Sequence, residues 1–331
     1  MPDVAGSGGG GSGGANSDGS SPDRPPDAPV PDASGDVSHD GARSTPKLTW
    51  TLMVSGWDAD FISGAANGEI WSASKPSSVL QVGADGTKST SSLALLNSAY
   101  VTGLWVAGPG NAYASAYANV VLHWDGSGSW KRDVMNSGTI FNSVWGAGPS
   151  DVYAVTDLGV YHSTGDDKWV LQPITQPTLS GLGWLTGTGP TDLWLAGDHG
   201  EMFRSTGDGT WRQEIATGVY YVNQLWAASP SEAYFVTYGS VMHRAPSTGR
   251  WAAETTPLAS SDLMYGVWGS GPNDVYVGAD HNHLLHSVGD GSWEDEGFAP
   301  GVANVSIKAI WGRSASDVYL GTSNGIYHGV P

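Results

Sequence analysis

The stretch VWGAGPSDVY at 144–153 returns as VWGSGPNDVY at 267–276 and as IWGRSASDVY at 310–319. Weaker copies begin at 104 and 225, and GPTDLW at 189–194 keeps the second half of the motif with Thr186 at the Trp position. With a degenerate first copy from 52, the Trp column falls at 53, 105, 145, 186, 226, 268 and 311. The spacings are therefore 52, 40, 41, 40, 42 and 43, and the long first one predicts an insertion at 84–98.

Each of the seven units is interpreted as four short strands. The first ends in the apolar–Trp pair, and a Gly-x-Gly-Pro-x-Asp turn leads to a second strand that alternates with period two. The third ends in His in most copies, and the fourth is marked by Trp130, Trp169, Trp211, Trp251 and Trp293. In the first copy 79–81 matches the fourth strand. No window has a sustained 3.6-residue apolar period, so we expect almost no helix.

Residues 48–331 number 284, or about 41 per unit, which is the length of one four-stranded propeller blade. A single such sheet buries neither face, whereas stacking in a closed ring buries both. The sequence therefore predicts an all-β, seven-bladed β-propeller with blades starting near 48, 99, 139, 180, 220, 262 and 305. The repeated Trp residues are interpreted as packing between blades, because each can bury about 150–250 Å².

The two ends of the repeat region are less regular. The last copy stops after its third strand at 325–328, so we expect a three-stranded last blade, or 45–47 along its edge. Residues 1–47 are rich in Gly, Ser, Asp and Pro and lack aromatic residues, which predicts a disordered linker or tether.

Composition excludes several functions. The chain has no Cys, which rules out disulfides and thiolate metal sites. Its 14 basic and 32 acidic residues give a net charge of −18, so no nucleic-acid partner is expected. No apolar run is long enough to span a membrane. We also expect the protein to be a monomer.

The repeat resembles those of secreted or surface β-propeller proteins of the myxobacterial type, over about 48–331. The turns at 205–211 and 287–293 also resemble degenerate Asp-boxes. The tail is similar to the linkers of bacterial surface lipoproteins. The resemblance implies an extracellular or cell-surface location, with a signal or anchor upstream of Met1, and it implies no particular activity.

Two polar columns repeat with the blades. The acidic column is interpreted as turn caps: Asp60, Asn111, Asp151, Asp192, Glu232, Asp274 and Asp317. The His column is interpreted as buried His bonded within its own blade, because one metal ion cannot be shared between blades about 10 Å apart: His123, His162, His243, His286 and His328.

Candidate ligand-binding residues lie in the loops between second and third strands and between blades, since loops on a rigid frame usually carry function. They are Tyr117, Asp157, Asp198, His199, Tyr221, Tyr238, Asp280, His281, His283 and Asn324, with 65–67, Phe141, Tyr220 and Tyr265 in the same set of loops. No cofactor is predicted. A divalent metal at Asp280, His281 and His283 is the weaker alternative to a solvated hairpin tip.

These features favour a non-catalytic binding or scaffolding propeller outside the cytoplasm, whose ligand is a glycan or a surface protein. Aromatic rings with Asp and Asn suit both ligands. One alternative is a polysaccharide hydrolase or lyase that uses carboxylates of the loop face, which needs two of them a few ångströms apart. The other is a structural spacer. No catalytic residue is assigned.

Overall fold

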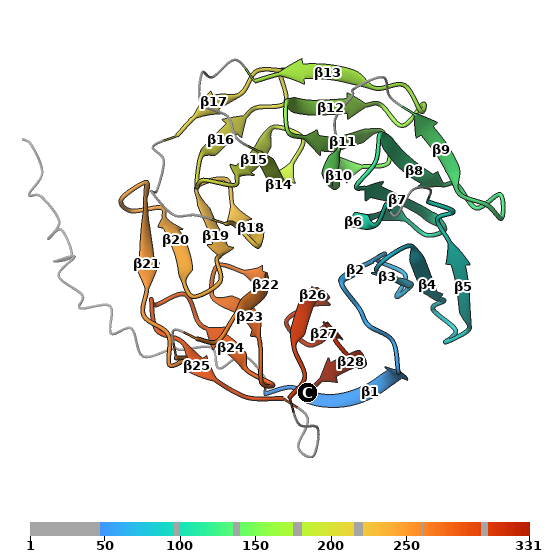
Figure 1. Ribbon diagram of the computed structural model, residues 1–331. Helices are drawn as coiled ribbons and strands as arrows, with labels where there is room; N and C mark the ends of the chain where they lie inside the picture. Colours follow the sequence, from blue (N-terminus) through green and yellow to red (C-terminus); the bar gives the residue numbers. More distant parts are fainter. Residues whose placement is uncertain are drawn as a thin grey trace, which may run out of the picture. The chain divides into compact units, whose positions relative to one another are not determined.

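The computed structural model describes residues 47–95, 99–134, 140–174, 181–214, 221–259, 261–298 and 304–331. In these ranges the regular elements are all strands, β1 to β28, in seven antiparallel four-stranded sheets. Figure 1 shows the sheets arranged as the blades of a ring. The predicted all-β, seven-bladed propeller is confirmed. The predicted tether at 1–47 lies outside the described residues except for Lys47.

Six blades follow the chain in order, from the inner strand to the outer one. The first has β2 (Phe61–Gly64), β3 (Ile70–Ser74), β4 (Ser78–Val82) and β5 (Lys88–Ser92). The second has β6 (Val101–Gly108), β7 (Asn111–Ala116), β8 (Val120–Trp124) and β9 (Lys131–Val134). The third has β10 (Phe141–Gly148), β11 (Asp151–Thr156), β12 (Gly159–Ser163) and β13 (Val170–Pro173).

The next three blades repeat this plan. The fourth has β14 (Leu182–Gly189), β15 (Asp192–Gly197), β16 (Met202–Ser205) and β17 (Arg212–Gln213). The fifth has β18 (Gln224–Ser229), β19 (Glu232–Val236), β20 (Val241–Ala245) and β21 (Arg250–Glu254). The sixth has β22 (Met264–Gly271), β23 (Asp274–Ala279), β24 (Leu284–Ser287) and β25 (Glu294–Asp295).

The last blade closes the ring and corrects the expected seam. It has β26 (Ile307–Ser314), β27 (Asp317–Thr322) and β28 (Gly325–Val330), and its outer strand is β1 (Thr49–Ser55). β1 pairs antiparallel with β28, from Thr49 opposite Val330 to Ser55 opposite Gly325. The last blade therefore has four strands rather than three, and its fourth strand is not the 45–47 segment.

This closure moves the start of the first blade. The stretch from 48, predicted to begin that blade, supplies the outer strand of the last one, and the inner strand of the first blade is β2. Gly64 contacts Trp311 as Gly146 contacts Trp105, which places Ser63 rather than Met53 in the Trp column. The column then reads 63, 105, 145, 186, 226, 268 and 311, so its first spacing is 42. The predicted insertion at 84–98 is wrong, and 79–81 belongs to the third strand, β4.

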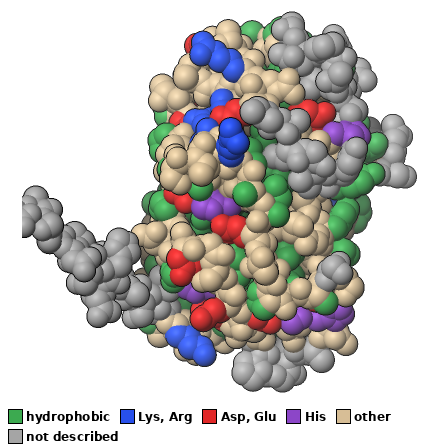
Figure 2. Space-filling model, turned by 90° about the vertical axis from the view of Figure 1, so that its left-hand side faces the viewer, with side chains coloured by type: hydrophobic (Ala, Val, Ile, Leu, Met, Phe, Trp, Pro, Cys, Tyr) green, Lys and Arg blue, Asp and Glu red, His purple; other side chains and the backbone are tan. Residues whose placement is uncertain are grey.

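The core consists of clusters between successive blades. Between the second and third blades, for example, Tyr113 and Val121 pack with Val144 and Val152. The inner Trp residues fit against glycines of the following blade: a Cβ on Gly269 would lie 2.7 Å from Trp226 Cη2. Figure 2 looks at the outer wall from the side, where acidic, basic and His side chains are interspersed.

The acidic and His columns form one hydrogen-bonded layer within each blade. Nε2 of His162 lies 2.7 Å from Asp151 Oδ1, and the His162 ring stacks on Tyr153 at 4.5 Å between centroids. In the first blade the acid is Glu69 rather than the predicted Asp60, and Gln81 takes the His position and donates to Glu69 over 2.8 Å. The five His residues bond within their own blades as predicted. His123 and His286 are buried, whereas His162, His243 and His328 are half-buried. The acids accept from these side chains rather than serving as turn caps alone.

Candidate ligand-binding site

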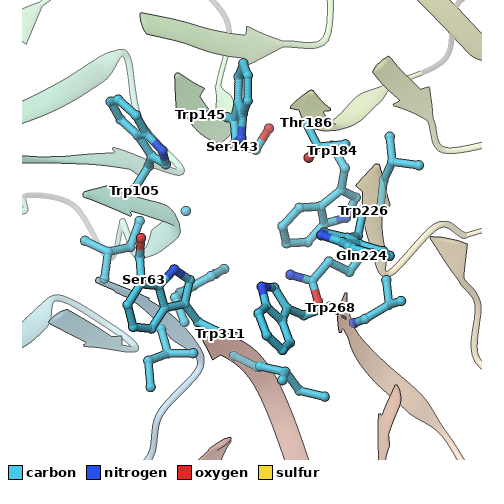
Figure 3. A pocket seen from close by; sticks show the side chains of 18 of the residues that line it. Ser63, Trp105, Ser143, Trp145, Trp184, Thr186, Gln224, Trp226, Trp268 and Trp311 are labelled. Carbon is cyan, nitrogen blue, oxygen red and sulfur yellow. Dashed lines mark hydrogen bonds between the residues drawn. The ribbon is translucent and has the colours of Figure 1, made fainter. Parts of the chain in front are cut away.

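A cavity of about 620 Å³ lies at the centre of the ring, where the inner strands of all seven blades meet. Figure 3 shows the side chains that surround it. Each inner strand runs from the face of the interblade loops, here called the upper face, towards the Gly-Pro turns. The repeat therefore places equivalent residues of the seven blades at one level of the cavity.

The Trp column forms this level of the wall, here called the inner ring: Ser63, Trp105, Trp145, Thr186, Trp226, Trp268 and Trp311. Its five indoles are half-buried. The benzo edge of each packs on a glycine of the next blade, so that the nitrogen edge faces the opening (Figure 3). Trp184 lines the cavity from a different register position of β14.

Some polar groups that line the cavity are hydrogen-bonded within the described part of the protein, and others are not. Trp184 Nε1 donates to Val222 O over 3.0 Å, and Ser63 Oγ accepts from Val106 N over 3.1 Å. Within the described ranges, the indole N–H groups of the five inner-ring Trp residues have no hydrogen-bond partner. Ser143, which also lines the cavity, is only 3% exposed, and its hydroxyl has no partner among the residues described.

Charged side chains lie at one sector of the cavity. Lys308 Nζ is 2.5 Å from Asp58 Oδ1 and 3.0 Å from Asp60 Oδ1. Burial lowers the pKa of Lys308, but the hydrogen bonds to these carboxylates outweigh it and the net shift is upward. Lys75 lines the cavity too, and its Nζ lies 5.5 Å from the centroid of the Tyr100 ring. No described carboxylate is within ion-pair distance of Lys75 Nζ.

The structure brings only some of the predicted residues to this cavity. Tyr238 lines it, as does Tyr265, whose hydroxyl donates to Asp280 over 3.2 Å. Tyr221 is 63% exposed and its ring centroid lies 6.0 Å from that of Tyr238. Phe141 is fully buried in the core, so it is not a surface aromatic as predicted. Tyr220 lies outside the described residues.

Other predicted residues are distributed around the upper face. Tyr117 stacks on Tyr100 with 4.8 Å between centroids. Asn324 is bonded within its own hairpin, where its Oδ1 accepts from Tyr327 Oη over 3.4 Å. The 65–67 segment connects β2 to β3, which places it in a Gly-Pro-type turn on the opposite face.

Two predicted carboxylates of neighbouring blades interact. Burial, and then the negative charge of Asp157, raise the pKa of Asp198. Asp157 accepts a hydrogen bond from Asn142 over 2.7 Å, and the main-chain N–H of His199 donates to Glu201 over 3.0 Å. Asp157 and Asp198 are not among the side chains that line the central cavity.

The predicted alternative of a metal at 280–283 needs three converging ligands. His281 Nδ1 lies 3.3 Å from Asp262, and His283 Nδ1 lies 2.5 Å from Asp295, so the two rings have different partners. Their centroids are 6.5 Å apart. Over the described ranges no group of three His, Asp or Glu side chains could hold a metal ion.

Sequence reasoning missed the inner ring as a site. It assigned the first-strand Trp residues to packing alone, which accounts for their benzo edges but not for their N–H groups. The available signal was the chemistry of the column: once Ser63 replaces Met53, all seven members carry a hydrogen-bond donor.

Comparison with known proteins supports the architecture. No protein-family model matches the chain, and no curated protein matches its sequence. Among solved structures it is similar to YCF48 bound to D1 peptide, with 13% identity, 86% of this chain and 95% of that one covered, and a TM-score of 0.68. The WD40 β-propeller domain of Doa1 gives 11% identity, 86% and 96% coverage, and a TM-score of 0.66.

A third similar structure is the extracellular domain of the hybrid two-component system BT3049 from B. thetaiotaomicron. It is 10% identical, with 86% of this chain and 41% of that one covered and a TM-score of 0.66. At these identities the likeness establishes the β-propeller class. In the described part of the chain, no helix is long and apolar enough to cross a membrane.

Proposed function

We propose that this chain is a non-catalytic binding propeller that holds a segment of a surface protein at its central cavity. The observation that carries the proposal is the inner ring, in which half-buried Trp residues converge on one cavity from five blades. Trp and Tyr are the residues that most often dominate binding energy at protein interfaces. The similarity to YCF48 bound to D1 peptide supports a polypeptide ligand.

The surroundings of the cavity also suit a protein partner. Four large apolar side chains on the upper face are at least 45% exposed: Tyr117, Leu158, Tyr221 and Tyr238. They come from loops of the second to fifth blades, whereas the charged sector belongs to the first and last blades. Apolar and aromatic residues beside a polar rim are typical of an interface.

The alternative of a polysaccharide hydrolase or lyase requires a pair of carboxylates at the reacting bond. Among the described lining residues Asp60 is the one carboxylate, and it is bonded to Lys308. Asp157 and Asp198 supply a second pair, in which the pKa of Asp198 is raised, but both lie outside the cavity lining. A binding role therefore fits the described cavity better.

An extracytoplasmic location belongs to the same proposal. It is supported by the similarity to extracellular domains of two B. thetaiotaomicron regulatory systems.

The experiment is a parallel screen of the whole chain on a display library of random peptides and on a glycan array. We expect saturable binding to a peptide class, lost in Trp145→Phe and retained in Trp169→Phe, which changes a Trp of an outer strand. Binding to glycans alone would favour the glycan ligand, and turnover of a bound polysaccharide would favour the enzyme. Binding to neither array, or binding unaffected by Trp145→Phe, would overturn the proposal.

A further inference from the structure

We infer that the inner ring recognises a carboxylate, carried by an acidic side chain or by the chain terminus of the partner. The inference rests on the proposed function, since it names the chemical group that the central cavity would hold. It follows from the donor chemistry of the ring, from one buried hydroxyl and from the charges beside the cavity.

The inner ring offers donors and almost no acceptors. An indole nitrogen can donate one hydrogen bond and accept none, and five of the seven members are Trp. Ser63 already accepts from Val106 N, so its hydroxyl hydrogen is what it can offer a ligand. Thr186 contributes a further hydroxyl. A ligand that satisfies this ring must therefore present acceptors, and a carboxylate presents about four acceptor sites on two oxygens.

The orientation of the indoles also favours a negatively charged ligand. The face of an aromatic ring is electronegative and its edge is electropositive. A cage for a cationic group would turn its faces inward. In Figure 3 the nitrogen edges of Trp105, Trp145 and Trp268 face the opening, so an anion meets the electropositive part of each ring.

Ser143 supplies an independent observation. Ser143 lines the cavity and is only 3% exposed. Its hydroxyl has no partner in the described part of the chain. Buried polar atoms without partners are uncommon in folded proteins, and each needs an explanation. A ligand oxygen at this level of β10 would satisfy the Ser143 hydroxyl.

Beside the cavity one ammonium group remains for an anion in spite of the net charge of −18. Lys308 pairs with both Asp58 and Asp60 and offsets one of their two negative charges. Lys75 has no described carboxylate at ion-pair distance, so its ammonium group is available at the cavity. More distant acidic groups act weakly, because the screening length is about 8 Å at physiological ionic strength.

The test follows the indole N–H resonances of the ¹⁵N-labelled full chain by NMR, with acetate as the probe and perchlorate at equal ionic strength as the control. Single Trp→Phe variants assign the signals. We expect the five inner-ring resonances to shift downfield and to saturate with acetate, while those of Trp169 and Trp293 stay in place. Lys75→Gln should weaken acetate binding several-fold, and Lys131→Gln, on the outer strand β9, should not.

Two peptide probes then distinguish the sources of the carboxylate. An N-acetylated, C-amidated Asp peptide carries only the side-chain carboxylate, and an acetylated Gly-Gly peptide carries only the terminal one. No acetate response, or equal responses of inner and outer indoles, would overturn the inference even if peptides bind. An acetate response without peptide binding would instead overturn the proposed function and leave the carboxylate site standing.

Discussion

Two sets of Trp residues occupy equivalent positions in successive blades, one on the inner strands and one on the outer strands, and the groups around their N–H differ. At the outer strands four of the five indoles reach back to the preceding blade, whereas the buried Nε1 of Trp251 has no partner among the described residues. Trp169 donates to Asp133 over 3.1 Å, and Trp293 donates to Glu254 over 2.8 Å. Trp130 and Trp211 donate likewise to Ser91 and Gln172. The inner-ring indoles have no such partner in the described ranges.

The difference shows that one residue type can satisfy two requirements of a propeller. At the outer strands the blades splay apart, so the indole fills the gap and its N–H secures the neighbouring blade. At the inner strands the blades converge on glycines such as Gly269 and Gly312, so packing uses the benzo edge alone. The N–H that remains is available for a ligand.

The largest expected effect comes from blocking the inner packing. A Cβ on Gly269 would lie 2.7 Å from Trp226 and would also meet the carbonyl oxygen of Asp274. Gly269→Ala should therefore lower the free energy of unfolding by about 3 kcal/mol, the upper end of the usual cost of overpacking. Gly271→Ala, where nothing lies within 4 Å, is the matched control. Equal urea midpoints for the two variants would contradict the packing described.

An effect of similar size is expected from pH. Burial lowers the pKa of His286, but its bonds to Asp274 and Glu296 outweigh this and raise the pKa to about 9. Since the folded pKa is above the usual value near 6.5, the stabilisation is complete below that pH and is lost as pH rises towards 9. At about 1.4 kcal/mol per pKa unit the loss is on the order of 3 kcal/mol.

The control for this pH effect is His286→Gln, because the first blade has a Gln, Gln81, at the equivalent position. The free energy of unfolding of the variant should fall less between pH 6.5 and pH 9 than that of the unaltered chain. Parallel pH profiles in urea denaturation would show that the layer of His and carboxylates does not titrate in this interval.

The third prediction compares the two Trp sets directly. Trp293→Phe removes an N–H that donates to Glu254, whereas Trp268→Phe removes one that has no partner within the described residues. Because a hydrogen bond to a charged group contributes about 1.5–3 kcal/mol, the outer variant should be less stable than the inner one by about 2 kcal/mol. Chemical denaturation of both measures this difference. An inner variant as unstable as the outer one would remove the distinction.

A smaller effect is expected at the seam between the last and first blades. Lys308 bridges Asp58 and Asp60 across a separation of about 250 residues in sequence. Its side chain is 24% exposed, so Lys308→Met should cost about 1 kcal/mol, and the cost should shrink at high salt. Lys131→Met, which removes an exposed pair with Asp125, should leave stability unchanged. Identical melting of both variants would contradict a role for Lys308 in closure.

The sequence predicts the architecture well because the packing repeats. Three features recur about every 41 residues: the Trp column, the Gly-Pro turns and the His column. Each of them corresponds to a contact that is made again in successive blades. The seam could not be predicted in the same way. β1 lacks the Trp-Gly motif, and pairing of Thr49–Ser55 with Gly325–Val330 joins the two ends of the repeat region.

The site was harder to predict for a physical reason. Loop residues such as Asp280 and His283 look functional because they are polar and exposed, yet their partners here are Tyr265, Ser306 and Asp295. The Trp residues of the inner ring look structural because they repeat. Which edge of an indole faces the cavity depends on the convergence of seven strands, and a linear motif does not encode it.

The most direct test of the contrast between the two Trp sets is hydrogen–deuterium exchange at the indole N–H groups, resolved by NMR without any ligand. We expect rapid exchange at the five inner-ring indoles, whose N–H groups face the cavity: Trp105, Trp145, Trp226, Trp268 and Trp311. We expect strong protection at Trp169 and Trp293, which are bonded to carboxylates. Equal protection of both sets would contradict this contrast, because the inner N–H groups would then be engaged within the protein and unable to receive a carboxylate.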